Sequence, residues 1–116
     1  MTAAKYDLEI DQGSSFSIAI TVSDESGARN LSTYNPRAQI RPAVDSPDAD
    51  KVDFTFDVSS MASGIIVMQL AHDVSAGMQA GAYVYDLEIF TGNTGSETSV
   101  TRLMQGNVTI NPEVTK

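Results

Sequence analysis

The sequence predicts an all-β fold, an antiparallel β-sandwich of about seven strands that occupies residues 1–116 as one domain. Three observations predict it. Apolar and polar residues alternate with a period of two, turn-forming residues recur at intervals of roughly 8 to 15 residues, and only one short segment has helical spacing. A small barrel would produce the same pattern. A chain of 116 residues buries enough apolar surface for one core without disulfides, and it contains no cysteine.

The first three predicted strands are separated by turn residues. Residues 6–10 and 15–22 each present one apolar and one polar face, with the turn Gln12-Gly13 between them. Residues 35–41 form the third strand, which ends before Pro42 because proline cannot donate a hydrogen bond to a β-ladder. We expect a loop after Pro42, up to Asp50.

The second half of the chain predicts four more strands. Residues 52–58 and 65–70 alternate around a turn at Ser63-Gly64, and both faces of the latter segment are partly apolar. Val74 and Met78 have the i, i+4 spacing of a single helical turn. Residues 83–89 and 99–110 then form a hairpin around the turn at residues 92–95.

The last strand must contain an irregularity. Leu103 has odd parity, whereas Val108 and Ile110 have even parity, so one residue has to be absorbed for all three side chains to face the core. We expect Gly106 to form this β-bulge.

Tyr83 favours a sandwich over a barrel. It opens the sixth strand directly after a loop, in the segment Gly81-Ala82-Tyr83, as the tyrosine corner does in immunoglobulin-like domains. We therefore predict the immunoglobulin-like variety of sandwich. Gly81 and Tyr83 are expected to be structural, with the Tyr83 hydroxyl bound to the backbone near the crossover that follows His72.

The charge balance argues against two classes of partner. Seven Lys and Arg residues against fifteen Asp and Glu residues give a formal net charge of −8. A field of this sign repels nucleic-acid phosphates and anionic lipid head groups. We expect neither nucleic acid nor a membrane surface as a partner.

The chain has few of the residues that enzymes need. His72 is the only histidine, and neither a nucleophile motif nor a phosphate-binding glycine loop accompanies it. We predict no enzyme and no cofactor. The acidic loop at residues 45–50 could bind calcium, although it lacks the glycine and terminal glutamate of an EF-hand. The alternative function is therefore a carbohydrate-binding or adhesin-like module that uses acidic loops, with calcium as a candidate ligand.

The two sheets are expected to differ in the chemistry of their outer faces. If residues 35–41, 83–89 and 99–110 share a sheet, arginines lie beside acids on its outer face. These outward residues are Arg37, Gln39, Arg41, Asp86, Glu88 and Arg102. Exposed pairs of this kind mainly fix the register of the strands, because each contributes only roughly a few tenths of a kcal/mol.

The opposite sheet is expected to carry a nearly uncharged strip on its outer face. The strip consists of Ser15, Ser17, Ala19, Ile65 and Val67. We name this set the outer strip, and we expect acids to rim it. The predicted rim residues are Asp7, Glu9, Asp53 and Asp57. Small side chains let another protein approach closely, so the outer strip is the predicted interface; the alternative is an ordinary exposed sheet face.

Several segments, taken in order, resemble small virion proteins of tailed bacteriophages, in particular the immunoglobulin-like N-terminal domain of phage baseplate upper proteins. The segments that carry the resemblance are Gln12-Gly13 with Phe16, Ala38-Gln39-Ile40-Arg41-Pro42, Gly81-Ala82-Tyr83-Val84-Tyr85-Asp86-Leu87, Arg102-Leu103-Met104-Gln105-Gly106-Asn107-Val108-Thr109 and Pro112-Glu113-Val114-Thr115. The resemblance extends over nearly the whole chain.

The resemblance implies a structural role in the virion, which is assembled in the host cytoplasm. The partners would be other virion proteins of the tail, baseplate, neck or capsid, contacted by one of several symmetric copies. Baseplate upper proteins continue into a receptor-binding region, whereas this sequence ends at Lys116. We therefore expect an adaptor or decoration role.

Overall fold

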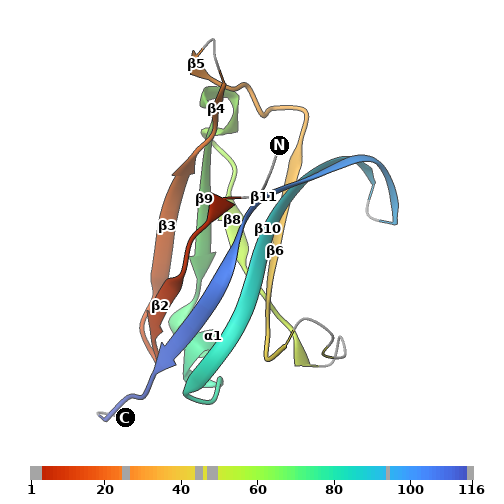
Figure 1. Ribbon diagram of the computed structural model, residues 1–116. Coiled ribbons are helices and arrows are strands. Elements are labelled where there is room, and N and C mark those ends of the chain that lie inside the picture. Colours follow the sequence, from red (N-terminus) through yellow and green to blue (C-terminus); the bar gives the residue numbers. More distant parts are fainter. Residues whose placement is uncertain (1–3, 25–26, 44–45, 47–49, 94, 115–116) are drawn as a thin grey trace.

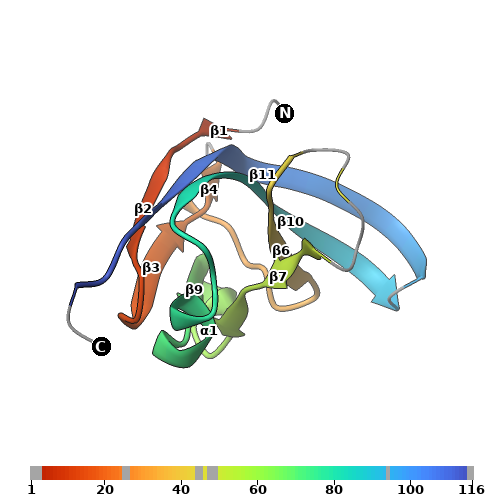
Figure 2. The ribbon, with the colours of Figure 1, turned by 90° about the horizontal axis from the view of Figure 1, so that it is seen from below.

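The computed structural model describes residues 4–24, 27–43, 46, 50–93 and 95–114, which form a sandwich of two β-sheets (Figures 1 and 2). Sheet A consists of β1 (Ala4–Lys5), β2 (Leu8–Asp11), β6 (Asn35–Arg41), β7 (Val52–Asp53), β10 (Gly81–Asn93) and β11 (Ser96–Asn111), and sheet B of β3 (Phe16–Thr21), β8 (Thr55–Asp57) and β9 (Ile65–Leu70). A small hairpin, β4 (Ser23–Asp24) and β5 (Gly27–Ala28), is separate from both. The predicted all-β sandwich is confirmed.

The core lies between the sheets and follows the predicted alternation. Side chains that alternate along β2, β6, β9, β10 and β11 are buried. They include Leu8, Ile10, Ala38, Ile40, Ile66, Met68, Leu70, Leu87, Ile89, Val108 and Ile110. The predicted helical turn is present as α1 (His72–Ala76), which connects sheet B to sheet A. A 3-10 helix, η2 (Met61–Ser63), precedes β9.

The N-terminal segment departs from a wholly antiparallel sandwich. Both β1 and β2 pair in parallel with β11, with Ala4 opposite Met104 and Leu8 opposite Val108. The paired segments come from opposite ends of the chain, so no tight hairpin turn imposes antiparallel pairing on them. The remaining strand pairs of the described residues are antiparallel.

The predicted strand at residues 52–58 changes sheet in its middle. Its first part, β7, pairs with β6 in sheet A, and its second part, β8, pairs with β9 in sheet B. Phe54 lies between the two parts, is 5% exposed, and donates its backbone N–H to the carbonyl of Ala38 at 3.1 Å. The polar–apolar alternation continues through this switch, which is why the sequence predicts a single strand.

The long hairpin of β10 and β11 forms the extended arm of the molecule (Figures 1 and 2). Its pairing shifts by one residue between Leu87, opposite Met104, and Glu88, opposite Arg102. The bulge residue is therefore Leu103, and the expectation that Gly106 forms the bulge is wrong. Leu103 and Met104 are both buried, so the irregularity lets two consecutive side chains enter the core.

Candidate protein interface

The outer strip is brought together on sheet B. Ala19 lies directly opposite Val67, and the next pairs on the same face of the sheet are Ser17 with Gln69 and Thr21 with Ile65. The neighbouring residues on β9 are buried, so Ile65 and Val67 point to the outer face. Ser15 is exposed immediately before β3.

The outer strip combines small exposed side chains with half-buried apolar ones. Ser15, Ser17 and Ala19 are exposed, as is the neighbouring Thr21, whereas Ile65 and Val67 are partly covered by their neighbours. The outer strip is therefore an uncharged surface made of small exposed side chains and half-buried aliphatic ones.

The predicted acidic rim is only partly present. Asp57 lies opposite Val67 on β8 and does border the outer strip. Asp53 lies opposite Gln39 in sheet A. Asp7 precedes β2 and Glu9 lies within it, and β2 pairs with β11 in sheet A. The expectation that these three acids border the outer strip is wrong, because the N-terminal strand joins sheet A and residues 52–58 divide between the sheets.

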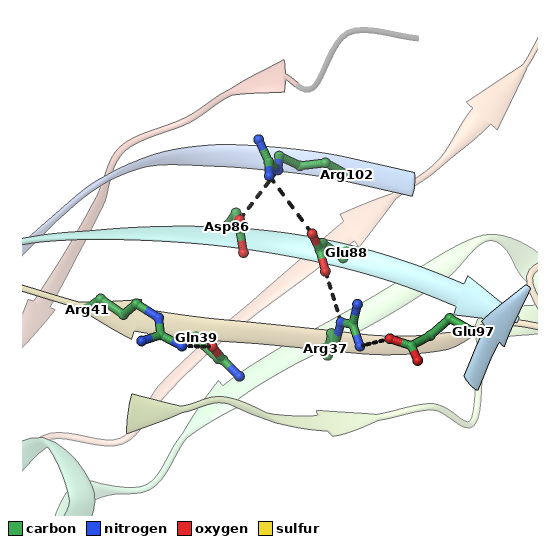
Figure 3. Close-up of polar contacts among 7 residues, drawn as sticks. All are labelled: Arg37, Gln39, Arg41, Asp86, Glu88, Glu97 and Arg102. Atoms are coloured by element: carbon green, nitrogen blue, oxygen red, sulfur yellow. Dashed lines mark hydrogen bonds and ion pairs between the residues drawn. The ribbon is translucent and has the colours of Figure 1, made fainter. Parts of the chain in front are cut away.

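The outer face of sheet A carries a network of ion pairs (Figure 3). Arg37 Nε lies 2.9 Å from Glu88 Oε1, and Arg37 Nη1 lies 2.9 Å from Glu97 Oε1. Arg102 spans the other side of β10, with Nε 3.4 Å from Asp86 Oδ2 and Nη2 4.0 Å from Glu88 Oε2. The predicted neighbourhood of arginines and acids is confirmed. Glu97 joins it from the hairpin arm, a position that lies outside the strand predicted from the sequence.

The network shifts the titration of its members. Hydrogen bonds from the Arg37 side chain lower the pKa of Glu97, and the hydrogen bonds to Glu88 and Glu97 raise the pKa of Arg37. Burial raises the pKa of Asp86, and the neighbouring charge of Glu88 adds to that increase. The guanidinium of Arg37 also lies over the Phe90 ring, 4.7 Å from its centroid. Near neutral pH the two arginines, Arg37 and Arg102, offset most of the charge of the three carboxylates.

A shallow hollow of about 460 Å³ lies on this face. Its polar lining includes Arg37, Gln39, Arg41, Asp86, Glu88, Arg102 and Gln105. Arg41 Nη2 donates to Gln39 Oε1 at 2.9 Å, and Arg41 Nη1 donates to the Ser46 carbonyl at 2.8 Å. The arginines in the hollow are thus engaged with their own chain, and the outer strip is the better candidate for a contact with another protein.

The predicted structural residues have identifiable roles. The Tyr83 hydroxyl donates to the carbonyl of Gln79 at 2.6 Å, in the segment between α1 and β10, as predicted. Gly81 begins β10 with a φ of +146°, a conformation that residues with a Cβ rarely adopt. Gly106 allows a close backbone approach, since a Cβ there would lie 2.3 Å from the carbonyl oxygen of Tyr6.

Sequence reasoning missed a second structural tyrosine. Tyr85 is 5% exposed, and its hydroxyl donates to the same Tyr6 carbonyl that Gly106 allows to approach. Tyr85 has the same parity as Tyr83, which indicated a core-facing side chain. Its hydrogen-bond partner could not be predicted because the partner depends on the parallel placement of the N-terminal segment.

The other candidates for chemistry are His72 and the acidic loop at residues 45–50. His72 is exposed at the start of α1. The acidic loop lies largely outside the described residues, which include only Ser46 and Asp50 of it. Within the described part of the chain, no three His, Asp or Glu residues gather closely enough to hold a metal ion.

No family model matches the sequence, and no curated protein matches it. None of the described helices is long and apolar enough to cross a membrane.

Proposed function

We propose that the protein is a non-enzymatic structural or adaptor module of a tailed bacteriophage particle, present as one of several symmetric copies. It docks on other virion proteins through the outer face of sheet B. The virion setting is suggested by the resemblance of the sequence segments to phage baseplate upper proteins. The docking role is suggested independently by the geometry of the outer strip.

The observation that carries the docking role is the uncharged centre of sheet B. Ala19 and Val67 face each other on adjacent strands, and the flanking pairs, Ser17 with Gln69 and Thr21 with Ile65, are also uncharged. The outer face of sheet A has a network of ion pairs instead. A protein with a net charge of −8 has enough charged residues to cover both sheets. Their unequal distribution favours sheet B as the face that another protein covers.

The order of the strands supports an immunoglobulin-like assignment. In such sandwiches strand F lies between strands C and G, and strand E lies between strands B and D. Here β10 lies between β6 and β11, and β9 lies between β3 and β8. Counting the strands along the chain gives the same correspondence. Modules of this type contact partners through faces, edges and terminal loops.

The proposal predicts that charges placed in the outer strip prevent docking. The double variant Ala19→Lys/Val67→Lys puts two ammonium groups opposite each other at the centre of sheet B. Both side chains point to the outer face of sheet B and not into the core, so we expect the isolated domain to remain folded. Two ammonium groups covered by a partner lose their hydration, and only Val67→Lys has an acid, Asp57, directly opposite, so we expect incorporation into particles to fall at least about tenfold. Incorporation is measured by complementation followed by protein analysis of purified particles.

A matched control places the same pair of charges on the other sheet. Ala82 and Thr109 are both exposed and lie directly opposite each other on β10 and β11. The variant Ala82→Lys/Thr109→Lys should therefore be incorporated normally. Normal incorporation of the Ala19→Lys/Val67→Lys variant would contradict docking through sheet B, and equal loss in both variants would assign the effect to net charge.

A further inference from the structure

The β3 strand has an unpaired edge. It pairs with β9 on one side, and no other described strand pairs with it. The N–H of Val22 donates to the carbonyl of Gly64 at 2.7 Å, which continues the register in which Ile20 lies opposite Ile66. In an antiparallel ladder the backbone N–H and carbonyl groups of successive residues point alternately toward and away from the neighbouring strand. Because Val22 is bonded to the β9 side, the even-numbered residues of β3 are the ones that bind β9. The N–H and carbonyl groups of Ser17, Ala19 and Thr21 consequently point away from the sheet.

This edge lacks the features that usually block further pairing. The six residues of β3 contain no charge and no proline, and their register with β9 has no bulge. Other edges are shorter or charged: β7 has two residues, β8 ends in Asp57, and β2 contains Glu9 and Asp11. Of the described edges, β3 is the one best suited to accept another strand.

The apolar side of β3 is also incompletely covered. Phe16, Ile18 and Ile20 point toward the core but remain partly exposed. The residues opposite them on β9 are almost fully buried. Their exposed fractions are 2% for Leu70, 0% for Met68 and 0% for Ile66. A strand added beside β3 would cover the exposed flanks of its three apolar side chains.

We propose that β3 pairs antiparallel with β3 of a second copy of this chain, around a two-fold axis at Ala19. In this register Ala19 lies opposite the same residue of the second copy, and Ser17 lies opposite Thr21. All three residues with outward-pointing backbone groups then form hydrogen-bonded pairs. A shift of the axis to Ile18 would leave only two such pairs within β3.

The side chains are complementary to themselves in the same register. Ile18 of each copy lies opposite Ile20 of the other on the core side, where apolar cross-strand pairs are favourable. The outer side brings only Ser, Ala and Thr together. Two molecules with a net charge of −8 repel each other, so a contact between copies is most favourable at an uncharged edge. The complementary side chains and the absence of charge both favour a second copy as the partner at this edge.

The dimer does not require the proposed virion role, although it would join two outer strips into one surface. A stable protein contact needs roughly 800 Å² from each partner, more than one narrow strip offers. Pairing through β3 leaves the outer face of the combined sheet accessible. The inference therefore identifies a second copy as the partner at the edge, distinct from the protein proposed to cover the face.

Single cysteines test the register because the chain contains no cysteine of its own. The Ala19→Cys variant should form a covalent dimer under mild oxidation, since opposed residues on paired strands are within disulfide reach. Ser17→Cys alone and Thr21→Cys alone should crosslink at least roughly tenfold more slowly, because like residues would then be about 13 Å apart. A mixture of Ser17→Cys and Thr21→Cys should crosslink readily.

Three outcomes would overturn the inference. The first is an Ala19→Cys rate no higher than that of Ser17→Cys, and the second is faster crosslinking in a mixture of Ser17→Cys and Ala19→Cys, which would move the axis. Sedimentation of the unmodified protein should show a monomer–dimer equilibrium, and a monomer at every concentration would also overturn it. The double variant Ala19→Cys/Val67→Lys separates docking through sheet B from dimerisation through β3. Val67→Lys places a charge on the outer face of sheet B, and it does not change the edge of β3. This variant should still crosslink, whatever its effect on incorporation.

Discussion

At the scale of single residues, Tyr85 connects three parts of the fold. Its ring makes an edge contact with Phe54, with the ring centroids 6.4 Å apart, and its hydroxyl binds the Tyr6 carbonyl between β1 and β2. Gly106 leaves the space that this backbone segment occupies. Burial of the phenol raises the pKa of Tyr85 to about 12, and the negative charge of Asp7 contributes to the increase.

The raised pKa of Tyr85 predicts a loss of stability in alkali. An unfolded tyrosine releases its proton near its ordinary pKa of 10.0, whereas folded Tyr85 keeps it up to about 12. The stabilisation is therefore complete below pH 10 and is lost as the pH rises through 12, at about 1.4 kcal/mol per pH unit in between. Between pH 10 and 12, the free energy of unfolding measured in urea should therefore fall more for the wild type than for Tyr85→Phe. Parallel pH profiles for the two proteins would contradict this assignment.

At the scale of elements, the alternation of side chains predicts faces better than it predicts partners. The strand predicted at residues 35–41 coincides with β6, and the opposed arginines and acids of sheet A follow from the same alternation. The alternation does not indicate the change of sheet at Phe54 or the parallel pairing of β1 and β2 with β11. Alternation states which side of a strand is buried, whereas pairing depends on where distant segments meet.

The same distinction applies to the candidate interface. Residues of the outer strip were predictable because each alternates with the core-facing residues of its own strand, and their cross-strand neighbours follow once β3 and β9 pair. The free edge of β3 was not predictable. It depends on the N-terminal strand joining β11 in sheet A, and the resulting long-range register is set by packing of the whole chain.

Ser75 provides a test of how α1 is attached to the sandwich. This serine is 0% exposed, and its Oγ accepts a hydrogen bond from Gly13 N–H and lies 3.0 Å from the Ser14 carbonyl, both in the turn between β2 and β3. Ser75→Ala leaves these groups without their partner, so we expect a loss of about 1 to 3 kcal/mol in the free energy of unfolding. Ser59→Ala is the matched control, because Ser59 is exposed and bonds only to Asp57. A similar effect of both substitutions would show that Ser75 does not anchor the helix.

At the scale of the whole molecule, the two sheets are joined through covalent crossings as well as through the core. Among the described elements the chain passes between the sheets from β2 to β3, from β3 through the β4–β5 hairpin to β6, from β7 to β8, and through α1 from β9 to β10 (Figure 2). At the step from β7 to β8, consecutive short strands belong to different sheets. Phe54 lies at this step, with its ring between Phe16 of sheet B, 6.3 Å away, and Tyr85 of sheet A. Its side chain therefore contacts both layers.

Phe54→Ala should weaken both sheets together. Removal of a buried phenyl ring leaves a cavity and costs about 3 to 5 kcal/mol in cores of this kind. Phe56 is a control of the same residue type two positions along; it faces the core from the edge strand β8 and is only partly buried. Phe56→Ala should therefore cost clearly less. Equal losses in urea unfolding would contradict the expectation that Phe54 contributes more than Phe56. A single unfolding transition in both variants would show that the two layers unfold as one unit.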